Sequence, residues 1–142
     1  MKSEKSSFRI LDHTADLRVK IRGNSQKELF KNAARGMFSV ITQINKITPN
    51  QSIPIELKAQ REEDLLVDWL NELIYLMSTR DILFCDFKID EISPEHIKAE
   101  ALGEKFNNKK HQINSEIKAA TYHNLKIDSH RQGQSVEVIF DV

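Results

Sequence analysis

The chain has 142 residues, enough for one domain of ordinary size, and its 21 Lys and Arg balance 21 Asp and Glu, so its formal net charge is zero. This balance excludes a chain-wide field that would attract nucleic acid or an anionic membrane, but it leaves a local basic patch open. The closest two of four glycines, Gly23 and Gly36, are 13 positions apart, which excludes Rossmann and Walker A phosphate loops.

Cys85 is the only cysteine, so the chain has neither an intrachain disulfide nor a Cys-x-x-Cys zinc or redox site. The first 17 residues contain charges but no uninterrupted apolar segment of the kind found in signal peptides. No apolar run approaches the roughly 18 residues of a membrane helix. We therefore expect a cytoplasmic protein without a membrane partner.

The first predicted elements are an extended segment and a helix. Residues 8–22 are extended, with apolar and charged residues alternating over 17–22, and the polar stretch 12–16 predicts a bend or bulge. Ser25 with Glu28 three positions later forms a capping box that begins a helix, whose apolar residues recur at 3–4 spacing as far as Ile41. Gly36 inside this helix indicates a close packing contact.

A strand and a second helix follow. Residues 52–59 alternate again, and Pro54 favours the beginning of a strand or an edge strand because proline has no backbone donor. Residues 62–79 form a helix with acidic residues in its first turn and a broad apolar face that includes Trp69. This face is expected to anchor the core.

The remainder is predicted to be mostly strand. Segments 83–89, 97–101, 117–127 and 136–142 each carry alternating apolar residues, and the polar, basic segment 104–115 reads as a loop. In the 117–127 strand the alternation puts Thr121 and His123 on the apolar face. The predicted fold class is α+β: a single domain over residues 1–142 with two helices packed on a largely antiparallel sheet.

Acidic residues offer one candidate metal site. Asp16 lies in the predicted break, Asp141 closes the last strand, and a carboxylate on Val142 would follow if the chain ends there. Together they would form an oxygen-only set suited to Ca²⁺ or Mg²⁺. Sequence spacing cannot bring residues 16 and 141 together, and solvated acids at strand ends are the common alternative.

Two further features have competing interpretations. Lys110, His111 and Lys118 belong to the basic concentration around 104–115, which is either a solvated loop or a contact for RNA phosphate or an acidic protein surface. His123 on an apolar face is either a core histidine with its hydrogen bonds satisfied or a functional group. None of the five histidines lies in a short zinc motif.

Taken together, several segments resemble the archease family in sequence and in order. The similarity spans nearly the whole chain, with two departures: Leu17-Arg18 stands where small or aliphatic residues are common, and Ala120 where the family often has Ile. The matching segments are His13-Thr14-Ala15-Asp16, residues 65–73 (LLVDWLNEL), Gly103-Glu104, Lys110-His111, residues 116–123 (EIKAATYH) and residues 138–142 (VIFDV).

This resemblance implies a small α+β protein with a strand–helix–strand–strand core that is not itself an enzyme. Archeases are cofactors of the RtcB-type tRNA-splicing and RNA-repair ligase, which uses GTP and divalent metal. They promote guanylylation of the ligase histidine and multiple turnover. Any contact with RNA or GTP would be indirect, through the ligase.

The resemblance also implies the roles of particular residues. A divalent-cation site for Ca²⁺, or for Mg²⁺ or Mn²⁺, would be built from Asp16, Asp141 and Val142. We expect partner contact from Lys110, His111 and Lys118, and support of the loop from Glu104, Thr121 and His123.

Two other functions stay open at this stage. One is a chaperone or specificity modulator of a tRNA methyltransferase, which predicts stable association with such an enzyme and no effect on guanylylation. The other is a stand-alone metal-dependent hydrolase, which no nucleophile–base spacing in the sequence supports.

Overall fold

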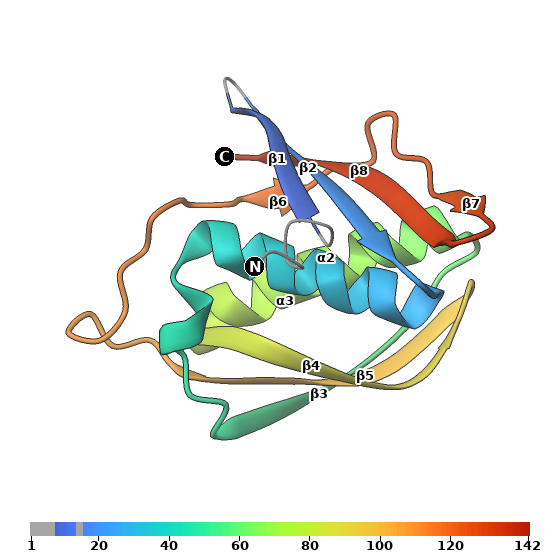
Figure 1. The fold of residues 1–142 in the computed structure, drawn as a ribbon. Helices are drawn as coiled ribbons and strands as arrows, with labels where there is room; N and C mark the ends of the chain where they lie inside the picture. The colour runs from blue at the N-terminus through green and yellow to red at the C-terminus, as the bar shows by residue number, and fades with distance from the viewer. Residues whose placement is uncertain (1–7, 14–15) are drawn as a thin grey trace.

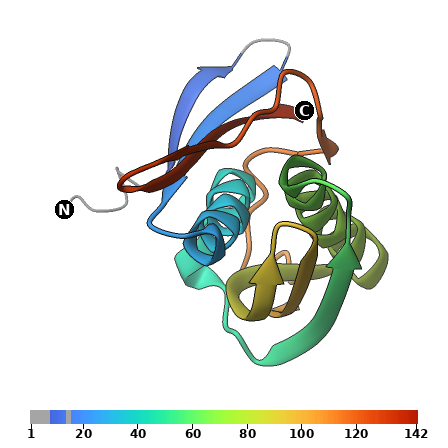
Figure 2. The same ribbon diagram turned by 90° about the vertical axis from the view of Figure 1, so that its right-hand side faces the viewer.

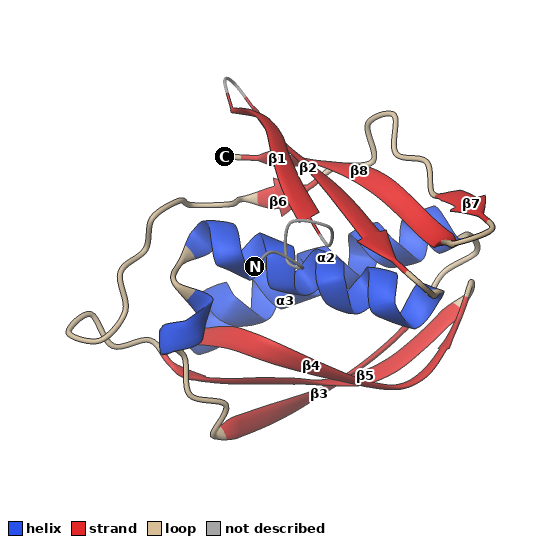
Figure 3. Cartoon of the chain, viewed as in Figure 1, coloured by secondary structure: helices blue, strands red, loops and turns tan. Residues whose placement is uncertain are grey.

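The computed structural model describes residues 8–13 and 16–142. Residues 1–7 lie outside the described residues, as do Thr14 and Ala15, the centre of the predicted bend. In the described part, two α-helices lie between two antiparallel sheets (Figures 1 and 2). The α+β class expected from the sequence is confirmed, and the strands divide into two sheets that cover opposite sides of the helix pair (Figure 3).

The strand order in each sheet differs from the order along the chain. The helices are α2 (Gln26–Ile41) and α3 (Glu62–Arg80), and a short 3-10 helix, η1 (Ile44–Lys46), follows α2. The five-stranded sheet has the order β1 (Phe8–His13), β2 (Asp16–Gly23), β8 (Gly133–Asp141), β6 (Ala119–Ala120), with β7 (Asp128–His130) also paired to β8. The three-stranded sheet has the order β3 (Gln51–Lys58), β5 (His96–Lys105), β4 (Ile82–Ser93).

Local sequence accounts for the start of α2. Ser25 is the N-cap, and its hydroxyl accepts the Glu28 N–H at 3.2 Å. The Glu28 carboxylate accepts the N–H of Asn24 at 2.9 Å, one residue before the cap that a standard capping box would use. Inside the helix, a Cβ on Gly36 would stand 3.1 Å from the Phe8 ring, which is the close contact that the sequence indicated.

The N-terminal extended segment is a hairpin rather than one bent strand. β1 and β2 pair in antiparallel fashion, and the chain reverses at the polar stretch that predicted a bend. Leu17, Val19 and Ile21 of β2 are fully buried, as their alternation indicated. Pro54 lies in β3, which is an edge strand of the smaller sheet, as expected.

Strand β4 departs from strict alternation. The register shifts between Phe84 and Asp86, and the four consecutive residues 82–85 are all buried. A bulge of this kind turns successive side chains to the same side, which a period-two pattern does not anticipate.

The predicted strand over 117–127 is mostly wrong. Only Ala119–Ala120 form a strand there, because the chain turns at Tyr122, whose carbonyl accepts the Leu125 N–H at 3.2 Å. Asn124 adopts a φ of 53°, a left-handed conformation that breaks the extended backbone of a regular strand. The position of His123 on an apolar strand face is therefore also wrong: its side chain is exposed.

The core fills the space between the two sheets. Trp69 on α3 is fully buried and donates its indole N–H to the Phe30 carbonyl of α2 at 3.0 Å, which joins the two helices. Phe38, Phe84 and Phe87 pack as an aromatic cluster with it. None of the helices described is long and apolar enough to span a membrane.

Candidate functional site

The strand register brings Asp16 and Asp141 together. β2 and β8 pair without interruption from Asp16 opposite Asp141 to Gly23 opposite Gln134. Residues directly opposite in an antiparallel pair share a face, with Cβ atoms about 4.5–5.5 Å apart. Because Leu17 and Phe140 are buried, Asp16 and Asp141 lie on the outer face of the sheet. We call Asp16, Asp141 and Val142 the acidic tip.

The acidic tip fits a divalent cation in part. Two carboxylates opposite each other repel, and a cation between them would remove that repulsion with the hard oxygen ligands that Ca²⁺ and Mg²⁺ prefer. Among the described side chains, those of residues 8, 9 and 16–142, no group of three or more His, Cys, Asp and Glu is placed to hold a metal ion. A third protein ligand would have to come from outside this set of side chains, for example a backbone carbonyl or, if the chain ends there, the Val142 carboxylate.

Lys118 lies beside the acidic tip. Its backbone N–H donates to the Asp141 carbonyl at 2.8 Å, and Ala119 is the register partner of Asp141 on the other side of β8. The Lys118 side chain is exposed. The structure thus places the backbone of Lys118 next to that of Asp141, at the end of the loop that leads from β5 to β6 (Figure 1).

The other end of this loop is held by Glu104 at the end of β5. One carboxylate oxygen, Oε2, accepts three hydrogen bonds: from Lys110 Nζ at 2.7 Å, from His111 Nε2 at 2.8 Å and from the Thr48 N–H at 3.0 Å. Only 12% of the Glu104 side chain is exposed. The hydrogen bond from Lys110, followed by that from Thr48, lowers the pKa of Glu104 to about 2, so it carries a charge at neutral pH. We call Thr48, Glu104, Lys110 and His111 the loop hub.

His111 is inside the loop hub rather than on the surface. Its side chain is 0% exposed. Nδ1 accepts the Asn107 N–H at 3.0 Å, which leaves the ring proton on Nε2 for donation to Glu104. The Phe106 ring lies against the imidazole, with centroids 6.0 Å apart. The expectation that His111 contacts a partner does not fit this position, and the geometry gives it a structural role in the loop.

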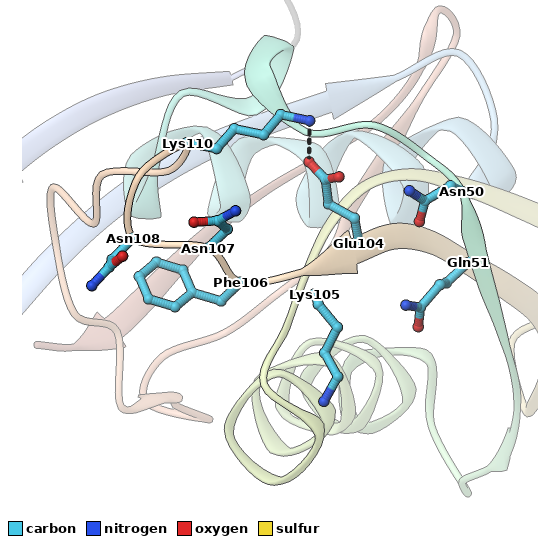
Figure 4. Close-up of a pocket in the computed structure, with 8 residues that line it drawn as sticks. All are labelled: Asn50, Gln51, Glu104, Lys105, Phe106, Asn107, Asn108 and Lys110. Atoms are coloured by element: carbon cyan, nitrogen blue, oxygen red, sulfur yellow. Dashed lines mark ion pairs between the residues drawn. The ribbon is translucent and has the colours of Figure 1, made fainter.

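Lys110 closes the loop hub on its exposed side. Its ammonium bridges Glu104 and the Thr48 hydroxyl, 2.9 Å away, and 41% of the side chain remains exposed. Beside this ion pair lies an open pocket of about 590 Å³ between the start of β3, the end of β5 and the loop (Figure 4). Figure 4 shows the Lys110 side chain reaching over this space toward Glu104.

Thr121 and His123 lie away from the loop hub. Thr121 donates its backbone N–H to the Ile139 carbonyl at 2.9 Å, and its buried hydroxyl has no hydrogen-bond partner among the described residues. His123 is exposed, with Asn124 Nδ2 3.3 Å from its Nε2. The structure therefore brings neither residue to the 104–115 segment that each was expected to support.

Residues of α3 fix the strand beside the acidic tip, which sequence reasoning missed. The Asn71 side-chain amide donates to the Ala120 carbonyl at 3.0 Å and accepts the Ala120 N–H at 2.8 Å. The Tyr122 hydroxyl donates to Asp68 at 2.8 Å, a hydrogen bond that raises the pKa of Tyr122 to about 12. Asn71 interrupts the apolar face of its helix, and that interruption was the signal available in the sequence.

The fold and these contacts define a small α+β protein with an acidic strand end and a long loop tied down at both ends. The model of the Archease protein family matches residues 8–142. Protein archease of Methanosarcina barkeri is 40% identical over 146 aligned residues that cover 100% of both chains. Protein archease of Pyrococcus furiosus is 38% identical over 120 residues, 82% of this chain and 84% of its own. The chain belongs to the archease family.

Solved structures agree with this assignment. The solution structure of Methanobacterium thermoautotrophicum protein 1598 superposes with a TM-score of 0.82 at 33% identity, over 96% of this chain and 99% of that one. The crystal structure of an archease from Thermotoga maritima, described as a possible chaperone, gives a TM-score of 0.65 at 26% identity, over 93% of this chain and 94% of that one.

Proposed function

We propose that this chain is a non-catalytic protein cofactor of an RtcB-type RNA ligase, promoting guanylylation of the ligase histidine and multiple turnover. The observation that carries the proposal is the pairing of Asp16 with Asp141 in a chain of the archease family. This pairing joins two segments of the family resemblance, one from each end of the chain. We further propose that the protein acts in the cytoplasm, where its one buried thiol, Cys85, would remain reduced.

The acidic tip is the proposed cation site. Asp16 and Asp141 would supply two carboxylates, and Val142 a third oxygen donor if the chain ends there. A bound Ca²⁺, Mg²⁺ or Mn²⁺ would supply positive charge of the kind that assists phosphoryl transfer. The chain's own contribution is to hold the two carboxylates on adjacent strands, where their repulsion favours a cation.

The loop between β5 and β6 is the proposed contact with the ligase. It carries Lys110 in the loop hub and, at the end that joins β6, Lys118, whose backbone is next to that of Asp141. Thr42 anchors the middle of the loop by donating its hydroxyl to the Gln112 carbonyl at 2.6 Å. A loop fixed at several points can present Lys118 and the acidic tip as one preorganised surface, at a low entropic cost of binding.

A guanylylation assay tests the proposal. The cognate ligase is incubated with labelled GTP and divalent metal, and this protein is added in substoichiometric amounts. We expect faster incorporation of label and repeated ligation turnover. Asp16→Asn and Asp141→Asn should remove the stimulation, whereas Asp90→Asn, on an exposed position of the opposite sheet, should keep it. Stimulation that survives both tip substitutions would refute the role of the acidic tip.

Cation binding has its own readout. A cation at 100 times its Kd stabilises the folded state by about 2.7 kcal/mol, so titration with CaCl₂, MgCl₂ or MnCl₂ should raise the Tm of the wild type and not of Asp16→Asn. An unchanged Tm in all three titrations would contradict the cation site without bearing on ligase activation.

The alternative is a chaperone or specificity modulator of a tRNA methyltransferase. The description of the Thermotoga maritima relative as a possible chaperone favours it. It predicts a stable complex with the methyltransferase and no change in guanylylation. An active ligase that does not respond to the folded protein would exclude our proposal and leave this alternative.

A further inference from the structure

A second charged surface lies at the far end of β2 from the acidic tip. The register runs from Asp16 at one end of β2 to Gly23 at the other, about 23 Å away at 3.3 Å per residue. Around Gly23 the structure has a groove of about 810 Å³. We define the basic groove by the Lys, Arg and His residues of its lining, which are Lys20, Arg22, Lys31, Arg35 and His130.

The positions of these residues follow from local structure. Lys20 and Arg22 alternate with buried residues of β2, so both lie on the outer face of the sheet. Lys31 and Arg35 are four residues apart on α2 and therefore lie on one side of that helix. His130 comes from β7, so three separate parts of the chain supply positive or titratable groups to one groove.

Two glycines let these parts approach closely. A Cβ on Gly23 would come 2.3 Å from the Leu29 backbone nitrogen, so the end of β2 packs directly on the first turns of α2. Gly133 has a φ of 131°, and a Cβ there would lie 2.2 Å from the Gly23 carbonyl oxygen. The turn between β7 and β8 thus packs on Gly23 as well, which closes the end of the groove.

Little negative charge opposes these groups. Glu28 is the one acidic residue in the lining, and its carboxylate already accepts the Asn24 N–H. Asp86 lies 3.7 Å from Lys31 and 3.6 Å from Arg35, long contacts between half-exposed side chains that neutralise each other weakly. Glu137 is directly opposite Lys20 on the outer face of the sheet, and its carboxylate pairs with Arg18 at 3.2 Å. Among residues 8, 9 and 16–142, whose side chains are described, neither Lys20 nor Arg22 forms an ion pair of its own.

The lining points to a polyanion rather than a protein surface. The remaining lining residues are Asn, Gln, Ser and Gly, so the groove contains no apolar or aromatic side chain. Protein interfaces depend on aromatic and apolar anchors at their centre, which this groove does not offer. Phosphodiester backbones are bound by Arg and Lys together with Asn, Gln and Ser, which is the composition found here.

We propose that the basic groove binds the phosphodiester backbone of a nucleic acid strand directly and without sequence preference. Without an aromatic side chain in the lining there is no platform for base stacking, so the affinity would come from phosphate contacts. This goes beyond ligase activation, in which RNA is reached only through the ligase. RNA and DNA share this backbone chemistry, and separate arms of the experiment distinguish them.

The test is fluorescence anisotropy of labelled, unstructured single strands, oligo(U) and oligo(dT), with the full chain and no ligase present. Four phosphate contacts from Lys20, Arg22, Lys31 and Arg35 predict a slope of log K against log salt of about −2.8. The affinity should then fall about 50-fold between about 50 and 200 mM salt. Tighter binding of oligo(U) assigns the groove to RNA, and equal binding assigns it to either strand; both support the proposal.

Two charge-matched double variants make the test specific. Lys20→Gln with Arg22→Gln removes two contacts, and the slope should drop to about −1.4, a loss of about 7-fold over the same salt range. Lys58→Gln with Lys98→Gln removes the same charge from exposed positions of the opposite sheet and should behave as the wild type. Circular dichroism confirms that each variant is folded.

Three results would overturn the proposal. The first is that the wild type binds neither strand at low salt. The second is that the two double variants lose the same affinity for the strand. The third is that poly-glutamate displaces the labelled strand as effectively as unlabelled strand does at equal charge. The last result would assign the groove to acidic proteins. Because the ligase is absent, each of them leaves ligase activation to be judged by its own assay.

Discussion

Replacing Glu104 with Gln keeps the shape of the side chain and removes the charge at the centre of the loop hub. The three hydrogen bonds to Oε2 lose the negative charge of their acceptor, although the Lys110 ammonium remains a charged donor. Such a change weakens each bond by about 1 kcal/mol. The Lys110 contribution is smaller, because 41% of that side chain is in contact with water. We therefore expect Glu104→Gln to lower the free energy of unfolding by about 2 kcal/mol at neutral pH.

The effect should depend on pH in a defined direction. The folded-state pKa of Glu104 is lowered from 4.5 to about 2, so the folded state favours the ionised form. This contribution to stability is fully present above pH 4.5 and is lost as the pH falls toward 2. The difference in stability between wild type and Glu104→Gln should therefore be largest near neutral pH and shrink through this window.

Urea unfolding of both proteins at about pH 7, 5 and 3 measures this difference in the free energy of unfolding. The other carboxylates titrate in both proteins, so their contribution cancels when the two free energies are subtracted. Glu100→Gln is the matched control on the same strand, because the hydrogen bond that Glu100 accepts from the Ser52 hydroxyl at 2.9 Å is exposed. Its effect should stay below about 0.5 kcal/mol. A Glu104→Gln protein as stable as the wild type at pH 7, or a difference that does not change with pH, would refute the loop hub as described.

Three further substitutions test the packing that positions the site. Asn71→Ala removes both hydrogen bonds to Ala120 and should lower the free energy of unfolding in urea by about 2 kcal/mol. Hydrogen exchange at the Ala120 amide should become faster, and unchanged exchange would contradict the role of Asn71. Trp69→Phe leaves the Phe30 carbonyl without its indole donor and should cost about 1–3 kcal/mol, read as a lower Tm. Gly103→Ala puts a Cβ 1.9 Å from the Leu83 carbonyl oxygen and should cost about 3 kcal/mol or more, and a wild-type Tm would disprove the close strand contact.

Local patterns were sufficient to predict the elements that depend on near neighbours. The alternation at Leu17, Val19 and Ile21 and the cap at Ser25 rest on interactions within a few residues, and the structure contains both. The strand expected at His123 was wrong for a related reason. One residue in a left-handed conformation, Asn124, ends the extended segment, and the alternation of apolar residues around it does not indicate that turn.

The candidate site was less accessible because it depends on contacts between distant segments. Asp16 and Asp141 meet only through the register of β2 with β8, which joins the two ends of the sequence. The sequence indicates an exposed His111 because its neighbours are polar. In the structure the chain folds back, and both ring nitrogens of His111 form hydrogen bonds, Nδ1 with the Asn107 N–H and Nε2 with the Glu104 carboxylate. Burial of a polar side chain depends on finding such partners, and sequence spacing does not report them.

The same limit applies to charge. A net charge of zero excludes a chain-wide field, yet β2 carries an acidic end at Asp16 and two cations, Lys20 and Arg22, toward its other end. The sum hides this separation because it discards position. Screening over about 8–10 Å in physiological salt weakens the interaction of Asp16 with these cations, which are about 13 Å away along the strand at Lys20 and about 20 Å away at Arg22. A cation at one end and a phosphate backbone at the other can therefore bind to the same strand without opposing each other. A net charge of zero limits only the long-range attraction of the whole chain. Local binding depends on which charged residues of β2 lie on the outer face at each end of the strand, Asp16 at one end and Lys20 and Arg22 toward the other.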